Sequence, residues 1–326
     1  MHTSLLAAFA AFAALTSLTC ALPAQAQQAY PAKPVRLIIP FPPGGSNDVV
    51  GRMFGQQLGD RLAQPVLIDN RGGAGSTIGT DAAAKSPADG YTLLLVSIAY
   101  SFSPAMYKSL PYDPDKAFTP VAPIGAGPAV LVVHPGVPIR TVKELIAHAQ
   151  ARPGALRIAS AGIGSFQHLA GELFRLQGKA ELLHVPYKGG GPAMTDVLGG
   201  HAEVMMGSLI QTIPHIRSGK LRALGVSGMK RNPALADVPT IAEAALPDYD
   251  ASNWWGVVAP AGTPQPVITR LHNEITAIVS SPETRKRLEN EGAEPLTMSP
   301  AEFGRFIQTE TRKWSRVVAE AGMKGE

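Results

Sequence analysis

The sequence predicts an α/β fold, because segments with strand character alternate with segments of helical periodicity along most of the chain. Two further observations refine this prediction. The connections between successive strands are too long for hairpins, which indicates mainly parallel sheets flanked by helices on both faces. Glycine-rich turns also follow several strands and precede helices, where the chain must turn sharply between the two kinds of element.

The first half of the chain begins with a strand and a helix. Residues 35–39 form an apolar run, and residues 48–62 carry apolar side chains at helical spacing. Thr141 and Glu144 form a capping box, which starts a helix that reaches about residue 151. The other elements predicted in this half are strands at 66–68, 91–96 and 129–134 and a helix at 79–85.

The second half continues the alternation and then ends in helices. The predicted strands are 156–160, 183–186, 202–206 and 221–226, and the predicted helices are 166–177, 193–198 and 210–217. Thr263 and Pro264 supply an N-cap and a first-turn proline for a later helix. Residues 300–321 place an apolar stripe along one helix face, which we interpret as core packing.

The first 26 residues differ from the rest of the chain and predict export. Residues 5–18 are almost all Leu, Ala and Phe, and residues 24–26 form a cleavage pattern of small residues, so residues 1–26 are interpreted as a secretory signal peptide. Cys20 is the only cysteine; it is either removed with this peptide, which we favour, or retained as a lipoprotein cysteine. We therefore expect a periplasmic protein without disulfides, whose remaining chain is long enough to bury a large core.

Composition and motifs exclude several classes of function. The formal net charge of +4 comes without a basic run, which suits a small acidic ligand better than nucleic acid. After residue 26, no apolar run approaches the roughly 20 residues of a membrane span. The glycine loops lack the lysine of a P-loop and the third glycine of a dinucleotide fingerprint, and the eight histidines lack metal-ligand spacing. We expect no cofactor, no metal and no stable membrane insertion.

Four glycine-rich loops each follow a strand and precede a helix in this prediction. They are residues 39–48, 70–77, 157–168 and 184–192. A helix N-terminus has unpaired N–H groups and about half a positive charge, and glycine lets a ligand approach the backbone. Each loop is therefore a candidate anion site, although any turn between a strand and a helix uses similar residues. In open α/β sheets such loops lie beyond the carboxyl ends of the strands, where ligands bind, and four together favour a binding site.

An enzyme is the less favoured interpretation. Ser165 and His168 lie three residues apart, as a nucleophile and a base on one helix face would. However, Gly164-Ser165-Phe166 breaks the Gly-x-Ser-x-Gly pattern of a hydrolase elbow. Ser165 is more simply a helix cap, and His168 a first-turn residue that donates to a ligand.

In their order along the chain, the motifs resemble those of the substrate-binding receptors of tripartite tricarboxylate transporters, the Bug family. The matching segments, which include Phe41-Pro-Pro-Gly-Gly-Ser-Asn-Asp48, are 30–36, 41–48, 70–75, 110–113, 161–168, 184–189, 219–224, 238–240 and 255–264. The resemblance implies an extracytoplasmic solute receptor that binds a small di- or tricarboxylate and delivers it to membrane permease subunits. A sensor subunit that presents the ligand to a signalling receptor is the alternative, with a hydrolase less favoured.

The resemblance also implies a two-lobed periplasmic binding protein of type II, a Venus flytrap that closes on its ligand. Lobe 1 would comprise residues 27–126 and 251–326, and lobe 2 residues 127–250, with the second crossing anywhere in 226–255. A ligand that contacts both lobes favours the closed form, because only differential affinity shifts such an equilibrium. We expect a monomer.

The ligand-binding residues that this resemblance implies lie on the glycine loops and after one strand. They are Pro43, Gly44, Gly45, Ser46, Asp48, Ser97, Gly162, Gly164, Ser165, His168, Tyr187, Lys188 and Gly189. The loop at Gly44 and the loop at Gly162 would face each other from the two lobes. Two anion sites placed in this way suit a ligand with a carboxylate at each end.

Overall fold

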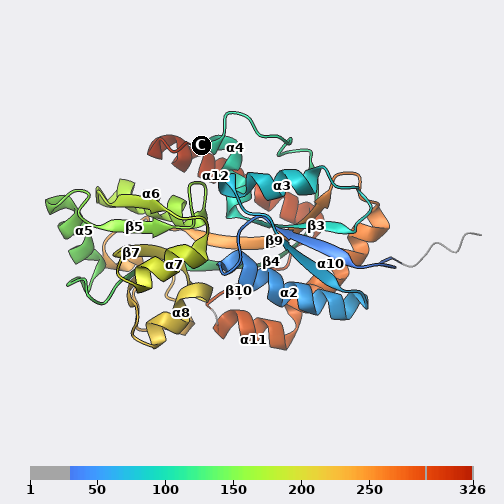
Figure 1. Cartoon of the computed structure of the whole chain (residues 1–326). Coiled ribbons are helices and arrows are strands. Elements are labelled where there is room, and N and C mark those ends of the chain that lie inside the picture. The colour runs from blue at the N-terminus through green and yellow to red at the C-terminus, as the bar shows by residue number, and fades with distance from the viewer. Residues whose placement is uncertain (1–29, 291, 325–326) are drawn as a thin grey trace, which may run out of the picture. The chain divides into compact units, whose positions relative to one another are not determined.

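A mixed sheet with helices packed against it organises residues 30–290 and 292–324, which the computed structural model describes (Figure 1). Its strands follow the order β2-β1-β3-β9-β4-β7-β5-β6, and β8 and β10 pair with β4. The signal peptide predicted at 1–26 lies outside the described residues. The α/β class predicted from the sequence is confirmed.

The strands are bounded as follows: β1 (Val35–Ile39), β2 (Val66–Asn70), β3 (Thr92–Ser97), β4 (Phe118–Val133), β5 (Arg157–Ser160), β6 (Leu183–Pro186), β7 (Val204–Ser208), β8 (Arg222–Val226), β9 (Ser252–Pro260) and β10 (Glu294–Pro295). The α-helices are α2 (Ser46–Leu62), α3 (Thr77–Ala84), α4 (Ile98–Met106), α5 (Val142–Ala151), α6 (Phe166–Gly178), α7 (Gly190–Leu198), α8 (Leu209–Arg217), α9 (Ile241–Ala244), α10 (Gln265–Ser280), α11 (Pro282–Asn290) and α12 (Pro300–Ala321). The short helices η2 (Ala74–Ser76) and η3 (Pro233–Leu235) complete the elements.

Parallel pairing is found in two groups of strands. β1 pairs in parallel with β2 and β3, and β5 pairs in parallel with β6 and β7. A helix follows each of β1, β3, β5, β6 and β7 directly, and α3 follows β2 after the short helix η2. The strand-loop-helix units that the sequence predicted are therefore formed in both groups.

Two antiparallel strands, β4 and β9, join these groups, and their full extent was not predicted. β9 pairs antiparallel with β3 and β4, and β4 pairs antiparallel with β7 and β8. The sheet is therefore mixed. Only the second half of β4 was predicted as a strand, because Pro120, Pro123 and Pro128 interrupt the signal of the first half. Register shifts follow Pro120 and Pro123, as expected where the ladder loses N–H donors.

β4 connects the two groups of strands within one continuous element. Up to Pro128 it pairs with β9, and from Ala129 it pairs with β7 and β8. Ser227 fixes this point, because its N–H donates to the Ala129 carbonyl (2.8 Å) and its hydroxyl accepts from the Ala129 N–H (2.7 Å). The returning chain meets the same residue, since the Ala251 N–H donates to the Ser227 carbonyl (2.9 Å). The described residues from 33 onward form one compact unit, so the lobe boundaries remain a prediction.

Helix α2 packs closely on β1 and β2 through a row of glycines, one per turn: Gly51, Gly55 and Gly59. A Cβ atom at Gly51 would lie 2.5 Å from Cδ1 of Ile39, and one at Gly55 would lie 2.9 Å from Cδ1 of Ile68. Side chains at these positions would push the helix away from the sheet. The glycines thus fix where the N-terminus of α2 lies.

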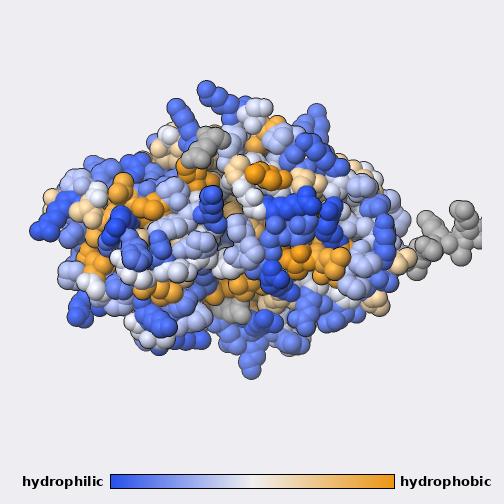
Figure 2. Space-filling view, in the orientation of Figure 1, coloured by the Kyte–Doolittle hydropathy of each residue, from blue (hydrophilic) through white to orange (hydrophobic). Residues whose placement is uncertain are grey.

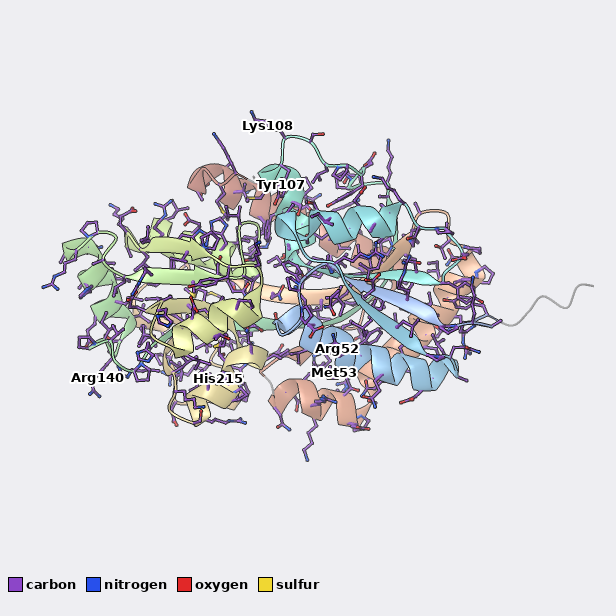
Figure 3. All side chains as sticks on the ribbon, viewed as in Figure 1. Arg52, Met53, Tyr107, Lys108, Arg140 and His215 are labelled. Carbon is purple, nitrogen blue, oxygen red and sulfur yellow. The ribbon has the colours of Figure 1, made fainter. Side chains whose placement is uncertain are left out.

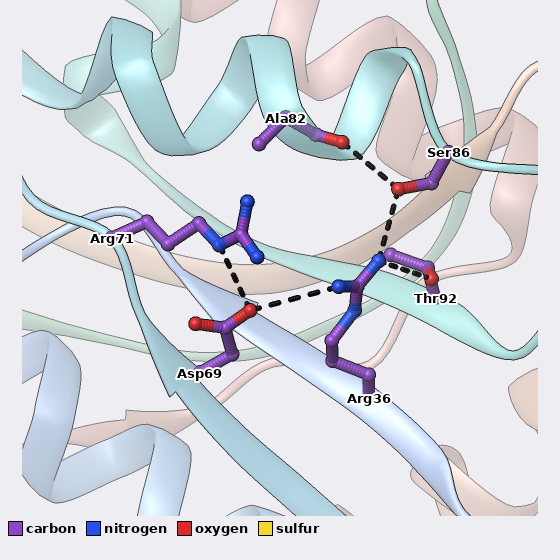
Figure 4. Close-up of polar contacts among 6 residues, drawn as sticks. All are labelled: Arg36, Asp69, Arg71, Ala82, Ser86 and Thr92. Atoms are coloured by element: carbon purple, nitrogen blue, oxygen red, sulfur yellow. Dashed lines mark hydrogen bonds and ion pairs between the residues drawn. The ribbon is translucent and has the colours of Figure 1, made fainter.

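A polar network ties the three parallel strands of the first group together (Figure 4). The Arg36 guanidinium on β1 donates to Ser86 Oγ (3.2 Å) and Thr92 Oγ1 (3.1 Å). It also forms an ion pair with Asp69 on β2 (3.8 Å), whose carboxylate accepts a hydrogen bond from Arg71 Nε (2.9 Å). These contacts brace the strands whose following loops form the candidate site.

The surface in Figure 2 is mostly hydrophilic, with apolar residues in separate patches. The large apolar side chains that are exposed lie on different segments: Leu67, Ile78, Leu183 and Met229. Among residues 30–290 and 292–324, no helix has both the length and the apolar character that crossing a membrane requires.

The packing of β9 against α12 yields a stability test at Gly256. A Cβ atom there would lie 2.3 Å from Cζ of the fully buried Phe303 and 3.0 Å from the Ala122 carbonyl oxygen. We expect Gly256→Ala to lower the free energy of unfolding by roughly 1–3 kcal/mol, because neither neighbour can move away freely. Urea denaturation measures this change.

Gly178→Ala is the matched control for this substitution. Its Cβ atom would make ordinary contacts of 3.5 Å or more, at the end of α6. We expect its stability to be unchanged or slightly higher, since alanine favours helix. Equal stability of the two variants would contradict the packing argument.

Candidate ligand-binding site

The four glycine loops of the sequence meet in two facing pairs. The loop after β1 faces the loop after β6: a Cβ atom at Gly44 would lie 3.6 Å from the Gly191 Cα, and one at Gly45 would lie 3.6 Å from the Gly190 nitrogen. The loop after β2 faces the loop after β5, since a Cβ atom at Gly164 would lie 3.1 Å from the Gly75 Cα. The sheet must curl to bring these loops together, because β2 and β6 stand at opposite ends of its strand order.

The Gly44 and Gly162 loops were expected to face each other, and residues of both loops line one cavity, described below. The nearest approach to Gly44 and Gly45 was not expected, because another loop makes it. The loop after β6 occupies the position opposite Gly44 and Gly45. β5 and β6 are parallel neighbours, so both of their loops reach the same edge of the sheet, and the sequence gives no signal of which one lies nearer to β1.

A small polar cavity lies between the first pair of loops, and we call it the inner chamber. Its volume is about 20 Å³, and its lining residues are Phe41, Pro42, Gly45, Ser46, Asn47, Ser97, Ala161, Phe166, Gln167, Gly190 and Asn253. These residues include the N-cap or first turn of four helices: α2, α4, α6 and α7. The first-turn N–H groups of a helix have no partner within the helix. No charged side chain is among the lining residues.

Hydrogen bonds hold two amide side chains of the inner chamber in place. Asn47 Oδ1 accepts from the Trp255 indole N–H (2.8 Å), which ties α2 to β9. Asn253 Oδ1 accepts from the Trp254 N–H (3.0 Å) and, at 3.4 Å, from the Ile98 N–H at the start of α4. Both oxygens are therefore engaged as acceptors within the protein.

A larger cavity adjoins the inner chamber, and we call it the outer chamber. It has a volume of about 550 Å³ and is lined by Phe41, Pro42, Gly72, Gly73, Ala74, Gly75, Ser76, Tyr107, Ala161, Gly162, Ile163, Pro186, Tyr187, Lys188 and Gly189. Three of these residues also line the inner chamber: Phe41, Pro42 and Ala161. Lys188 is the one lining residue that carries a charge at neutral pH. Tyr107 reaches the chamber from the end of α4 (Figure 3).

The candidate residues divide between lining and supporting positions. Gly45, Ser46 and Ser97 line the inner chamber, and Gly162, Tyr187, Lys188 and Gly189 line the outer chamber. The remaining candidates line neither: Pro43, Gly44, Asp48, Gly164, Ser165 and His168. The Tyr187 hydroxyl donates to Asp196 (2.6 Å), so this side chain contributes its ring to the chamber and commits its hydroxyl elsewhere.

Asp48 shapes the first loop from behind. Its carboxylate accepts from the Gly44 N–H (3.0 Å), from Arg52 Nε (2.9 Å) and from Asn70 Nδ2 (2.9 Å). Burial acts to raise the pKa of this carboxyl, but the bonds from Arg52, Gly44 and Asn70 outweigh burial, so the pKa lies below its ordinary value. Arg52 lies on α2 (Figure 3), one turn beyond Asp48. These three hydrogen bonds hold the Asp48 carboxylate in place, where it stabilises the turn at Gly44.

The two glycines of the first loop differ in conformation. Gly44 has φ +88°, in the left-handed region that favours glycine. Gly45 has φ −90° and ψ 172° as the N-cap of α2, a conformation open to any residue. Gly44 therefore serves the turn, whereas a Cβ atom at Gly45 would make an ordinary contact of 3.6 Å with the Gly190 nitrogen.

A stacked pair of histidines supports the loop after β5. The His168 and His184 rings are parallel within 5°, with centroids 4.1 Å apart. His184 Nε2 lies 2.6 Å from Ser160 Oγ, which also accepts from the Gly162 N–H (3.1 Å). His168 Nδ1 faces the Gly164 N–H at 3.4 Å, so Nδ1 is the unprotonated nitrogen. Burial, and then the charge of His184, lower the pKa of His168 to about 3, and burial also lowers that of His184.

Ser165 is a helix cap, as predicted. It is 1 % exposed, and its hydroxyl accepts from the His168 N–H (3.3 Å) at the start of α6. No group of three or more His, Cys, Asp or Glu that could hold a metal occurs in the described part of the chain.

Several lining residues were missing from the candidates. Asn253 could not be placed, because β9 was not predicted as a strand. Asn47, Gln167 and Gly190 lie within loops that were identified, beside the residues chosen. The loop at 72–76 was recognised as a glycine loop but supplied no candidate residue.

Comparison with known proteins identifies the class to which this fold and site belong. The family model of the tripartite tricarboxylate transporter family receptor matches residues 50–323. BugT of Bordetella pertussis is 41% identical over 293 residues, which cover 89% of this chain and 90% of BugT.

Two solved structures are similar over nearly their whole length. The R. palustris protein Rpa4515, described with adipate, has a TM-score of 0.88 and 35% identity, covering 90% of this chain and 99% of that one. MatC from Rhodopseudomonas palustris, described with bound malate, has a TM-score of 0.84 and 30% identity, covering 89% and 100%.

The fold is therefore that of a periplasmic binding protein. The chain belongs to the receptor family of the tripartite tricarboxylate transporters. This is a periplasmic family of substrate-binding receptors, and not of enzymes.

The buried histidines predict a loss of stability in acid. In the folded protein His168 stays neutral down to about pH 3, whereas in the unfolded chain it binds a proton below its ordinary pKa of about 6.5. The unfolded state thus binds more protons between these values, so stability is full above about pH 6.5 and falls as the pH decreases. Between about pH 7 and pH 5, His168 should contribute a loss on the order of 2 kcal/mol.

His168→Asn tests this contribution by urea denaturation across the pH range. The asparagine oxygen can replace Nδ1 as the acceptor for Gly164, but asparagine does not titrate. We expect the variant to lose less stability between about pH 7 and pH 5 than the wild type. His201→Gln, at an exposed histidine, is the control and should keep the wild-type slope. An unchanged slope in His168→Asn would contradict the assignment.

Proposed function

We propose that this protein is a receptor that holds a small dicarboxylate between its facing glycine loops and delivers it to membrane permease subunits. The observation that carries the proposal is the convergence of four helix N-termini on an inner chamber whose lining residues have no charged side chain. Such a chamber favours an anion, because the helix N-termini stabilise a negative charge placed between them.

The electrostatics of the inner chamber favour a carboxylate over a neutral group. Each helix N-terminus stabilises a nearby negative charge by about 0.3–1 kcal/mol, and by up to about 2 kcal/mol in partly buried sites. Hydrogen bonds to a charged group contribute roughly 1.5–3 kcal/mol each, more than bonds to a neutral one. No side-chain carboxylate lies among the lining residues to compete for these N–H groups, since Asp48 is bound behind the loop.

The size of the inner chamber implies that the loops separate when the ligand enters. A volume of about 20 Å³ is close to what one water molecule requires, and a carboxylate needs more. Gly44 and Gly45 must therefore move away from Gly190 and Gly191. We propose that the loops belong to two lobes, divided near the predicted boundaries, with Ser227 at the place where both crossings meet.

The comparisons support a ligand with two carboxylates. The two similar structures are described with adipate and with bound malate, and both of these acids are dicarboxylates. The family model is that of a transporter receptor, which favours permease subunits over a signalling receptor as the partner. We propose further that residues 1–26 are removed on export and that the mature receptor acts as a monomer in the periplasm.

Calorimetric titration with adipate and malate tests the proposed function directly. We expect at least one of these acids to bind and to raise the melting temperature, by mass action on the folded state. Solution scattering should show a smaller radius with ligand than without, because the ligand-free protein holds the loops apart for entry and the bound ligand draws the two lobes together. Absence of binding across a panel of small carboxylates would contradict the proposal.

Gly45→Val tests the close approach of the loops. Its backbone conformation accepts valine, so the protein should fold, but the added methyl groups would keep Gly45 from closing on Gly190. We expect a loss of affinity of roughly 1.5–3 kcal/mol, as when a hydrogen bond to a charged group is lost. Gly45→Ala should have a smaller effect, because its Cβ atom makes an ordinary contact of 3.6 Å. Wild-type affinity in Gly45→Val would place the anion elsewhere.

A further inference from the structure

The loop after β2 contains an unusual run of left-handed residues. Gly73, Ala74, Gly75 and Ser76 have φ values of +131°, +44°, +58° and +94°. Two of the four are not glycine, although side chains are disfavoured in this region and normally occur there singly. Residues held in such conformations cluster at functional sites, where the surrounding structure maintains them.

Ser76 combines this conformation with a buried hydroxyl that has no partner. The residue is 2 % exposed, and no described residue forms a hydrogen bond with its Oγ. Its backbone is satisfied, since its N–H donates to the Gly73 carbonyl (3.1 Å) and its carbonyl accepts from Thr80 Oγ1 (2.9 Å). Most buried polar groups are paired, so an unpaired hydroxyl calls for a specific explanation.

The position of Ser76 in the outer chamber supplies that explanation. It is one of the residues that line this chamber, as are Tyr107 and Lys188. The loop is held against the opposite loop, since a Cβ atom at Gly75 would lie 3.1 Å from the Ile163 carbonyl oxygen. Ser76 therefore stands in the part of the site that receives the outer end of a ligand whose first carboxylate lies in the inner chamber.

We propose that Ser76 is a specificity-determining residue, whose hydroxyl donates to the second carboxylate of the ligand while the Lys188 ammonium supplies the opposing charge. A rotation about the Cα–Cβ bond presents the hydroxyl to the chamber. A ligand without a second carboxylate leaves the hydroxyl unpaired and the ammonium without a counter-charge, so the site selects dicarboxylates over monocarboxylates. This inference rests on the proposed function and assigns a role within that site.

Substitution of Ser76 by glycine should change the stability of the protein and its affinity for a dicarboxylate in opposite directions. Glycine adopts φ +94° without strain, so Ser76→Gly relieves the backbone and removes the hydroxyl in one substitution. The melting temperature should then rise while affinity for a dicarboxylate falls. A residue with only a structural role would not move these two quantities in opposite directions.

The experiment is calorimetric titration with three matched pairs of acids: succinate with butyrate, adipate with hexanoate, and terephthalate with benzoate. The wild type should bind the preferred diacid more tightly than its partner. Ser76→Gly should weaken that diacid roughly tenfold to a hundredfold, the loss of a hydrogen bond to a charged group, and leave the monoacid unchanged. Ser76→Ala, which keeps the side-chain strain, should show the same loss without the rise in melting temperature.

Ala63→Gly is the matched control, because Ala63 is another non-glycine residue at positive φ (+51°) and lies at the far end of α2. It should gain stability without any change in affinity. Unchanged diacid affinity in Ser76→Gly, or equal losses for diacid and monoacid, overturns the role of Ser76 and leaves the proposed function standing. Failure of the wild type to bind either member of every pair overturns both.

Discussion

The structure depends on the electrostatic repulsion between four helix N-termini that meet at the inner chamber, where no lining residue carries a negative side chain. Four helices direct their N-terminal ends at the inner chamber, and like ends of helix dipoles repel one another. The glycine row of α2 and the amide contacts of Asn47 and Asn253 hold these ends in position. On the proposed function, an anionic ligand relieves this repulsion and gains binding energy from the same helix N-termini. The same electrostatic field therefore opposes the packing of the helices and favours the ligand.

The sequence was most informative where structure is local. Parallel strands followed by glycine loops and helices have strong signals, because the apolar runs are short, the caps are explicit, and the turns need glycine. Thus β1, β5 and β6 and the helices after them were predicted within a few residues. The strand β9 and the first half of β4 were missed, since prolines and glycines mask their pattern and antiparallel pairing between distant segments leaves no local trace.

The sequence was sufficient to identify the loops that form the site, but not which residues of different loops contact one another. Some lining residues were identified because their types have recognisable roles: a glycine in a tight loop (Gly45), a serine at a helix start (Ser46) and a cationic side chain (Lys188). Which loop faces which depends on how the sheet curls, and that depends on strand order, which local patterns do not encode. Ser76 lies in a glycine loop that was identified, but no sequence signal singled it out; its backbone conformation and its unpaired hydroxyl distinguish it.

Four helices place their N-terminal ends at the inner chamber, and this has an evolutionary consequence. A main-chain N–H group survives every substitution except proline, so drift in the sequence leaves these donors in place. The side chains that line the outer chamber, such as Tyr107, Lys188 and Ser76, have no such protection. A receptor built in this way can change what its outer chamber recognises by a few substitutions, while the donors of the inner chamber are inherited intact.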